Sequence, residues 1–208
     1  AGSTVTTLGN SRIVLEPQAR YINRSNSSPR LEVRQNLRGV KGWRLLSSPV
    51  LTSYADFLDS LETQGYPGAK FDSLQPNVLW FAETDTGTTL QSWRQPSNAS
   101  DSTLLGRGHF VYVFDGAGYP SRVTGGGNYA DTLPVILTTV GQEIDLSAGD
   151  FTFPELTYTP RALSTQADTA GGNTFFLDEN VADAGWNLLG NPTPSVLNWD
   201  ATSGAWDY

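Results

Sequence analysis

Apolar and polar residues alternate along much of this chain, in short runs separated by Gly, Pro, Asn and Asp. The clearest run, PRLEVRQNL, covers 29–37 and places Leu31 and Val33 on one face and Glu32 and Arg34 on the other. A period of two residues predicts a β-strand with one buried face and one face in water. Further strand-like runs lie at 12–17, 77–83, 109–115 and 134–140. The pattern predicts an all-β fold, an antiparallel β-sandwich of the jelly-roll or immunoglobulin-like type.

One segment departs from this pattern and predicts a helix. In TSYADFLDSLETQG (52–65), apolar residues recur at i, i+3, i+4 and i+7, which is the spacing of one helix face. They are Tyr54, Phe57, Leu58 and Leu61. Ser53 is placed to cap the first turn, with Asp56 three residues on, and Gly65 is placed to end the helix. The sequence therefore predicts one short helix near 53–64.

The composition agrees with a β-rich protein. Aromatic residues make up 11% of the 208 residues and charged residues 16%, below the usual fraction of roughly a quarter. There is no cysteine, so neither a disulfide nor a thiolate metal site can form. No apolar run is long enough to predict a helix through a membrane. The chain begins AGSTVTT, as expected of an exported product whose signal peptide has been removed.

Charge divides the chain into two predicted parts. Residues 1–44 carry eight basic and two acidic residues, a net charge of +6. Residues 45–208 carry five basic and nineteen acidic residues, a net charge of −14. We therefore expect a basic, β-rich N-terminal arm at 1–40 and an acidic body at 41–208. Nucleic acid is not an expected partner, because the acidic body repels phosphate.

The predicted arm has two candidate positions. It forms the first strands of its own sandwich, or it pairs with the acidic body of a neighbouring copy. In the second case complementary charge steers the contact. A head-to-tail contact that does not close on itself then generates a filament. The sequence leaves both alternatives open.

The sequence offers no set of catalytic residues. It has no cysteine nucleophile and no GxSxG motif, and its single histidine, His109, heads the apolar run HFVYVFD, where a strand residue is expected. Paired carboxylates can hydrolyse glycosidic bonds without histidine. However, most acidic residues here lie in turn sequences such as ETDTG and FDGAG, where Asp bonds to its own backbone. We therefore expect a protein that is not an enzyme.

Calcium is the one cofactor that the sequence suggests. The segment LDENVADAG (177–185) gathers hard oxygen donors of the kind that calcium prefers, although their spacing matches no EF-hand. These candidate ligands are Asp178, Glu179, Asn180 and Asp183. The alternative interpretation of this segment is an acidic turn in water.

Two further features concern sugars. Asn-X-Ser sequences of the kind that carry glycans place candidate attachment sites at Asn23, Asn26 and Asn98; unmodified turns are the alternative. Exposed tryptophans that stack on sugars are the second feature. The candidates for sugar stacking are Trp93, Trp199 and Trp206. The tryptophans expected in the core, because they open or interrupt apolar runs, are Trp43, Trp80 and Trp186.

One phrase occurs twice along the chain. GWRLLSSPV begins at Gly42, and GWNLLGNPTPSVLNWD begins at Gly185. In each copy Gly permits a close approach, Trp is expected to anchor the core and Pro is expected to end the strand. Two copies predict equivalent strands in two packed sheets. Chance similarity of two apolar strands is the alternative.

The second copy resembles a phrase that recurs in large secreted and surface proteins of bacteria with type IX secretion. Other segments of that family resemble this chain in the same order: GWRLLSSPV, YADFLDSLETQGYPGA, PNVLWFAE, SWRQPSNAS and GRGHFVYVFDG. The resemblance covers about 41–118 and 185–203. It implies an exported, β-rich protein, and it implies no catalytic residue.

The sequence therefore predicts an extracellular structural protein at the cell surface. This is either a surface-layer or filament subunit, which assembles head to tail with copies of itself through its arm, or an adhesin scaffold. The alternative is a carbohydrate-binding or carbohydrate-active module of a secreted protein, whose partners would be glycans.

Overall fold

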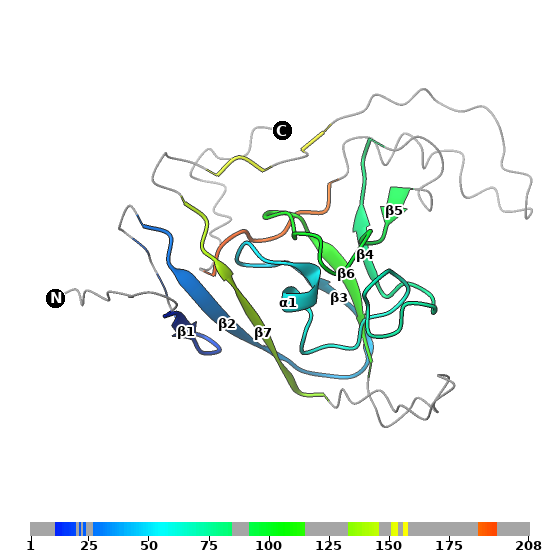
Figure 1. The fold of residues 1–208 in the computed structure, drawn as a ribbon, viewed down its shortest axis with the longest axis horizontal. Coiled ribbons are helices and arrows are strands. Elements are labelled where there is room, and N and C mark those ends of the chain that lie inside the picture. Colours follow the sequence, from blue (N-terminus) through cyan, green and yellow to red (C-terminus); the bar gives the residue numbers. More distant parts are fainter. Residues whose placement is uncertain are drawn as a thin grey trace, which may run out of the picture.

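The computed structural model describes residues 11–19, 21, 23, 27–84, 92–114, 133–145, 151–153, 156–157 and 187–194. These residues form two sheets of mostly antiparallel strands and one short helix, α1 (Tyr54–Phe57) (Figure 1). The strands of the first sheet are, in order, β1 (Ile13–Leu15), β2 (Arg30–Leu37) and β7 (Val135–Gln142). Those of the second sheet are β3 (Gly42–Leu46), β6 (His109–Val113), β4 (Val78–Phe81) and β5 (Trp93–Arg94). The prediction of a β-rich fold with one short helix is confirmed.

β2 is the central strand of the first sheet. It pairs antiparallel with β7 over its whole length, from Arg30 opposite Gln142 to Leu37 opposite Val135. On its other side β1 runs parallel to it and pairs only with Leu31–Val33. Within a single copy, therefore, these two strands of the N-terminal region lie in the sheet of their own chain. Pairing between copies stays a prediction.

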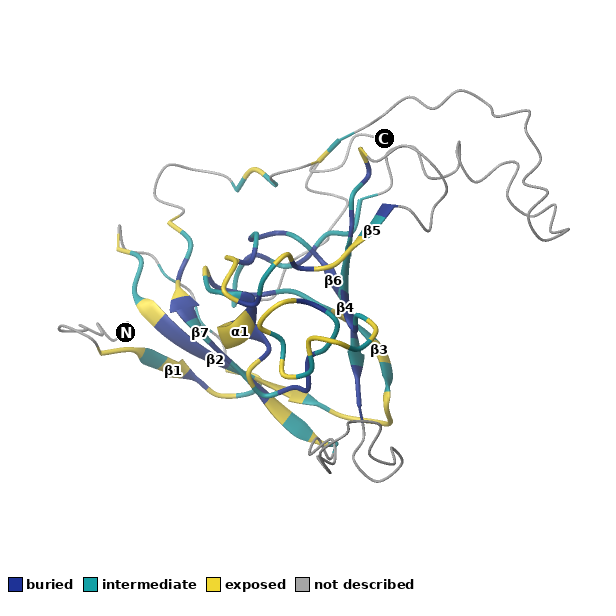
Figure 2. Cartoon of the chain, turned by 45° about the vertical axis from the view of Figure 1, so that its right-hand side comes forward, coloured by how far each residue is buried: buried dark blue, intermediate teal, exposed yellow. Residues whose placement is uncertain are grey.

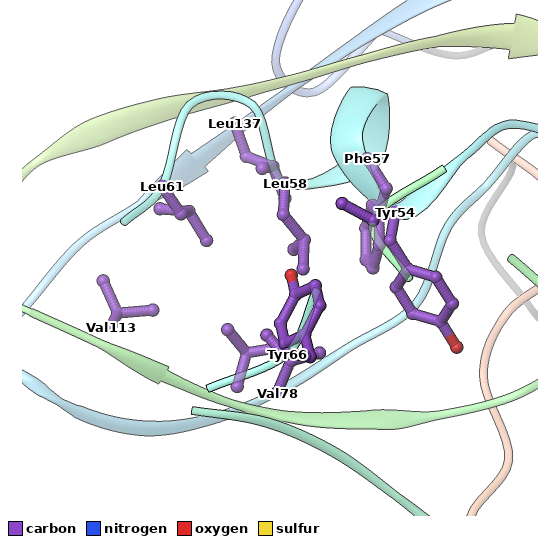
Figure 3. Close-up of a cluster of buried hydrophobic side chains, with 10 residues drawn as sticks. Tyr54, Phe57, Leu58, Leu61, Tyr66, Val78, Val113 and Leu137 are labelled. Atoms are coloured by element: carbon purple, nitrogen blue, oxygen red, sulfur yellow. The ribbon is translucent and has the colours of Figure 1, made fainter. Parts of the chain in front are cut away.

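Side chains from both sheets meet in one core. Val111 and Val113 of β6 and Leu137 of β7 are fully buried, and α1 with the turn after it fills the space between the sheets (Figures 1 and 3). The residues in this space are Tyr54, Phe57, Leu58, Leu61 and Tyr66. Burying one side chain of this size contributes about 1.5–3 kcal/mol, so this cluster holds the two sheets together.

The helix begins where the sequence predicts and ends sooner. The Ser53 hydroxyl oxygen accepts a hydrogen bond from the Asp56 N–H at 3.1 Å, which is the expected N-cap. The backbone leaves the helical conformation at Leu58, with φ −111° and ψ 15°. The Ser60 hydroxyl oxygen then accepts a hydrogen bond from the Thr138 N–H of β7 at 3.1 Å. The predicted length of the helix is wrong, because contacts with the sheet replace its later turns.

Trp43 lies on the surface, so the expectation that it anchors the core is wrong. It is 41% exposed, its ring stacks on Phe110 at 5.3 Å between centroids, and it meets Tyr112 edge-on. Alternate residues of a strand point to opposite faces of its sheet. Since Val111 and Val113 point into the core, Tyr112 between them occupies the outer face. Trp43, which lies opposite Tyr112 in the pairing of β3 with β6, occupies the same face.

The two copies of the repeated phrase touch each other. β3 pairs with β6, while Leu189 of the second copy forms an antiparallel bridge with Arg107, just before β6. The Ser47 hydroxyl donates a hydrogen bond to the Asn191 carbonyl oxygen, and Gly190 lies against the Ser47 side chain. The described parts of both copies therefore pair with the same stretch of chain, Arg107 and β6. The prediction that the two copies lie in two packed sheets is wrong. Equivalent patterns predict equivalent conformations, but they do not select the partner strand.

Candidate functional site

An open strand edge lies on β2, beyond the end of β1. β1 ends its pairing with β2 at Leu15, and the next residues form a turn closed by a hydrogen bond from the Ala19 N–H to the Glu16 carbonyl oxygen at 2.9 Å. Pro17 has no N–H to donate, and Gln18 has a φ of 71°, outside the extended region. In the part of the chain that the structure describes, Arg34–Leu37 therefore pair only with β7. We call these four residues the open edge; burial along β2 falls off at the same point (Figure 2).

Two hollows lie along the open edge. The larger, of about 500 Å³, is lined by Pro17, Gln18 and β2 residues from Arg34 to Arg38. The smaller, of about 290 Å³, lies between the first sheet and the segments around Ser47 and Thr193. The residues that line both hollows are Gln18, Arg34 and Gln35. The two hollows therefore adjoin, and both lie beside the part of β2 that follows its pairing with β1.

Four charged side chains hold β1 beside β2. Glu32 forms ion pairs with Arg12 and Arg34, and Arg34 also pairs with Glu16. Glu32 is only 2% exposed, so the prediction that this face of β2 lies in water is wrong at its centre. Burial raises the pKa of Glu32, but the hydrogen bond and charge of Arg34 and the charge of Arg12 hold it below its usual value. All three guanidinium nitrogens of Arg34 are bonded at the border of the open edge.

A second polar cluster fastens the link between β1 and β2 to the end of β7. The Tyr21 hydroxyl and the Asn23 amide donate hydrogen bonds to Glu143 Oε2 at 3.0 and 2.7 Å. The Asn23 amide also donates to the Ser27 carbonyl oxygen at 2.7 Å. Burial, followed by the bond to Glu143, raises the pKa of Tyr21. A glycan at Asn23, one of the predicted positions, would displace at least one of these two amide bonds.

Asn98, another predicted glycan position, lies in a tight turn. Its Oδ1 accepts hydrogen bonds from the N–H and the hydroxyl of Ser100, both at 2.9 Å. The Asn98 N–H in turn donates to Asp101 Oδ2 at 2.8 Å. The local hydrogen bonds thus use the oxygen of the Asn98 side chain in the turn geometry typical of Asn.

The outer face of the second sheet carries a row of aromatic rings. Trp93, predicted as a sugar-stacking residue, is half-buried on β5. Its ring meets Phe81 edge-on at 5.3 Å and stacks with Phe110 at 5.7 Å between centroids. Because Trp43 also stacks on Phe110, two tryptophans share one phenylalanine on this face. The sequence missed Trp43 as a member of this surface.

His109 is fully buried and serves the core. The Tyr54 hydroxyl lies 3.0 Å from His109 Nε2. Burial, and then the positive charge of Arg107, lowers the pKa of His109 to about 3, so its imidazole is neutral at physiological pH. The Arg107 guanidinium lies over the ring of Trp80 at 3.8 Å, and Trp80 is half-buried rather than in the core as expected.

Several predicted residues lie outside the described part of the chain. They are Asn26, Asp178, Glu179, Asn180, Asp183, Trp186, Trp199 and Trp206. Among the described residues, no group of three or more acidic or histidine side chains is arranged to hold a metal ion. The same residues include no helix with the length and apolar character needed to cross a membrane.

Comparison of the chain with protein-family models, with curated proteins and with solved structures finds no match. The sequence did not predict the open edge of β2. Its one signal in the sequence is Pro17, since a proline cannot donate a backbone hydrogen bond to the neighbouring strand.

Proposed function

We propose that this chain is an extracellular structural protein that assembles with copies of itself, as a subunit of a filament or a surface layer. The observation that carries the proposal is the open edge Arg34–Leu37 with its two adjoining hollows. Adding a strand to such an edge is an established mode of protein recognition. No catalytic role is part of the proposal.

The protection of β7 at its end supports this proposal. The outer side of β7 is covered where Leu51 and Gln142 exchange backbone hydrogen bonds of 2.8 and 3.0 Å. Natural proteins protect sheet edges in such ways because a bare edge invites pairing with another chain. An edge left bare beside two hollows is therefore a surface suited to a partner strand.

The cellular location and the finer fold are parts of the same proposal. The resemblance of the repeated phrase to surface proteins of bacteria with type IX secretion supports an extracellular, cell-surface protein. The core shared by β6 and β7 supports a β-sandwich of the jelly-roll or immunoglobulin-like type. An adhesin scaffold would use the same architecture, with self-assembly as its means of display.

Negative-stain electron microscopy of the purified full chain tests the proposal. Over a series of protein concentrations we expect filaments or layers with a regular repeat. Particles of monomer size at every concentration would remove the basis for a structural, self-assembling role.

A second candidate function rests on a different observation, the aromatic row on the second sheet. Trp43 is 41% exposed beside Phe110, and exposed rings of this kind stack on sugars. This supports a carbohydrate-binding module as the alternative. Affinity electrophoresis in gels containing polysaccharide tests it. Retardation should be lost in Trp43→Ala and kept in Leu45→Ala, a matched control that is 64% exposed on the same strand.

A further inference from the structure

We infer that the open edge receives residues 3–8, STVTTL, of a second copy of this chain, which continue the line of β1 as an added strand. This rests on the proposed function and names the segment and the site through which copies join.

The direction of β1 separates the open edge from the N-terminus of its own chain. β1 runs parallel to β2, with Ile13 opposite Leu31 and Leu15 opposite Val33. The chain therefore enters β1 from the Arg30 end of β2, while the open edge lies beyond Leu15, toward Leu37. Within one copy, the N-terminal end of β1 therefore points away from the open edge. A second copy can approach the open edge from its Leu37 end.

The segment STVTTL has the character of an added strand. It carries no charge, and four of its six residues are Thr or Val, which favour extended conformations. Six extended residues span about 20 Å, and the four residues of the open edge span about 13 Å. The segment is thus long enough to cover the whole edge.

The site can accept this segment without burying an unpaired charge. Arg34 already bonds to Glu16 and Glu32, and Arg38, which lines the far end of the larger hollow, is exposed and can keep its charge in water. Leu15 and Val33 contribute apolar surface to the smaller hollow, where an apolar side chain of the incoming strand fits. Backbone groups of β2 that face away from β7 gain partners, as the edges of natural sheets require.

The contact joins two different surfaces of the chain. One copy offers its N-terminal segment, and the other offers the edge of β2. Such a contact is heterologous, so each added copy presents a fresh edge to the next. The result is a head-to-tail filament unless the rotation between copies closes a ring.

Photo-cross-linking between isotopically distinct full-length chains tests this inference. The chain has no cysteine, so Thr6→Cys provides a single attachment point for a benzophenone-maleimide probe. The labelled light chain is mixed with unlabelled, heavy-isotope wild-type chain under assembly conditions, irradiated and digested. We expect mass spectrometry to find light position 6 joined to heavy peptides that contain Arg34–Arg38.

A matched control places the same probe on Ser73, which is exposed on the body of the chain. It should give no link to Arg34–Arg38. Links from position 6 only to the same light chain, only to other surfaces, or to nothing in an assembled sample would overturn the inference.

A pair of substitutions at position 6 provides a second, independent test. Thr6→Pro removes an N–H and fixes φ, so assembly should need about tenfold more protein, the effect of one lost hydrogen bond. Thr6→Val keeps the branched side chain and should assemble like wild type. If wild type assembles and Thr6→Pro assembles equally well, this inference fails while the proposed function stands. If wild type does not assemble, both fail.

Discussion

The Ser47 hydroxyl donates a hydrogen bond of 3.2 Å to the carbonyl oxygen of Asn191, across 144 residues of sequence. This bond joins matching parts of the two Gly-Trp phrases, because Ser47 and Gly190 hold the same place in each phrase. The repeat therefore forms a contact between its own two copies. At this contact the second copy lies beside the start of β6, where Leu189 pairs with Arg107.

We expect Gly190→Ala to weaken the fold at this contact. A Cβ atom at position 190 would overlap with the Ser47 side chain and would lie 2.7 Å from the Arg107 carbonyl oxygen. Forcing extra atoms into a packed site costs about 1–3 kcal/mol, which urea unfolding would measure. Adding Ser47→Gly removes one of the two overlaps and should restore part of the loss. Unchanged stability in Gly190→Ala would show that the two copies do not pack this closely.

The buried histidine predicts a dependence of stability on pH. The pKa of His109 is about 3 in the fold and 6.5 as its ordinary value, so between these values only the unfolded state binds the proton. Stability should therefore fall as pH falls from about 6.5 toward 3, by up to about 1.4 kcal/mol per pH unit. Chemical unfolding at a series of pH values measures this slope.

The variant His109→Gln isolates this contribution, because it retains a side chain that can bond to the Tyr54 hydroxyl. The comparison belongs between about pH 5 and 6.5, above the range in which most carboxyl groups titrate. There the variant should lose the extra slope of the wild type. Identical slopes in the two proteins would contradict a neutral, buried His109.

Glu32→Gln should loosen β1 from β2. Glu32 pairs with both Arg12 and Arg34, so the neutral variant removes the charge that holds Arg12 of the β1 segment. Hydrogen exchange of the backbone amides at Ile13–Leu15 should become about tenfold faster. Arg30→Gln is the matched control, since Arg30 is an exposed residue of the same strand and should leave that exchange unchanged. Equal exchange in the two variants would show that the ion pairs do not fix β1.

The lowered pKa of Glu32 predicts how the attachment of β1 to β2 changes in acid. Its ordinary value is 4.5, and the value in the fold lies below this. The stabilising contribution of its charge is therefore complete above about 4.5 and is lost as pH falls through the lower, folded value. Exchange of the β1 amides in the wild type should accordingly approach that of Glu32→Gln in acid.

Local patterns predicted the parts of this fold that depend on local chemistry. The alternation at 29–37 placed β2, and the cap formed by Ser53 and Asp56 placed the start of α1. The length of α1 was not predictable, because it ends where β7 supplies a hydrogen bond to Ser60. That contact joins residues far apart in sequence.

The candidate site depended still more on distant contacts. Nothing in PRLEVRQNL shows that β1 covers only Leu31–Val33, or that no other described strand pairs with the edge beyond. Likewise, the alternation of residues along a strand shows which residues share a face of the sheet with Trp43. It does not show whether the core covers that face or the opposite one. The whole chain determines which strands pair and which faces of the sheets are covered. These contacts cannot be predicted from single segments of the sequence.

Trp43→Ala separates the two candidate functions. Trp43 lies on the second sheet and the open edge lies on the first, so we expect this variant to assemble as the wild type does. Light scattering at matched concentrations checks this result. Loss of assembly in Trp43→Ala would move the contact between copies to the aromatic row and away from β2.

The central claim, that this chain joins to copies of itself without closing, is tested most directly by sedimentation velocity of the intact protein over a wide concentration series. We predict that the weight-average sedimentation coefficient rises steadily with concentration and reaches no limiting dimer. A single species of monomer size, or a closed dimer that takes up no further copies at any concentration, would contradict it.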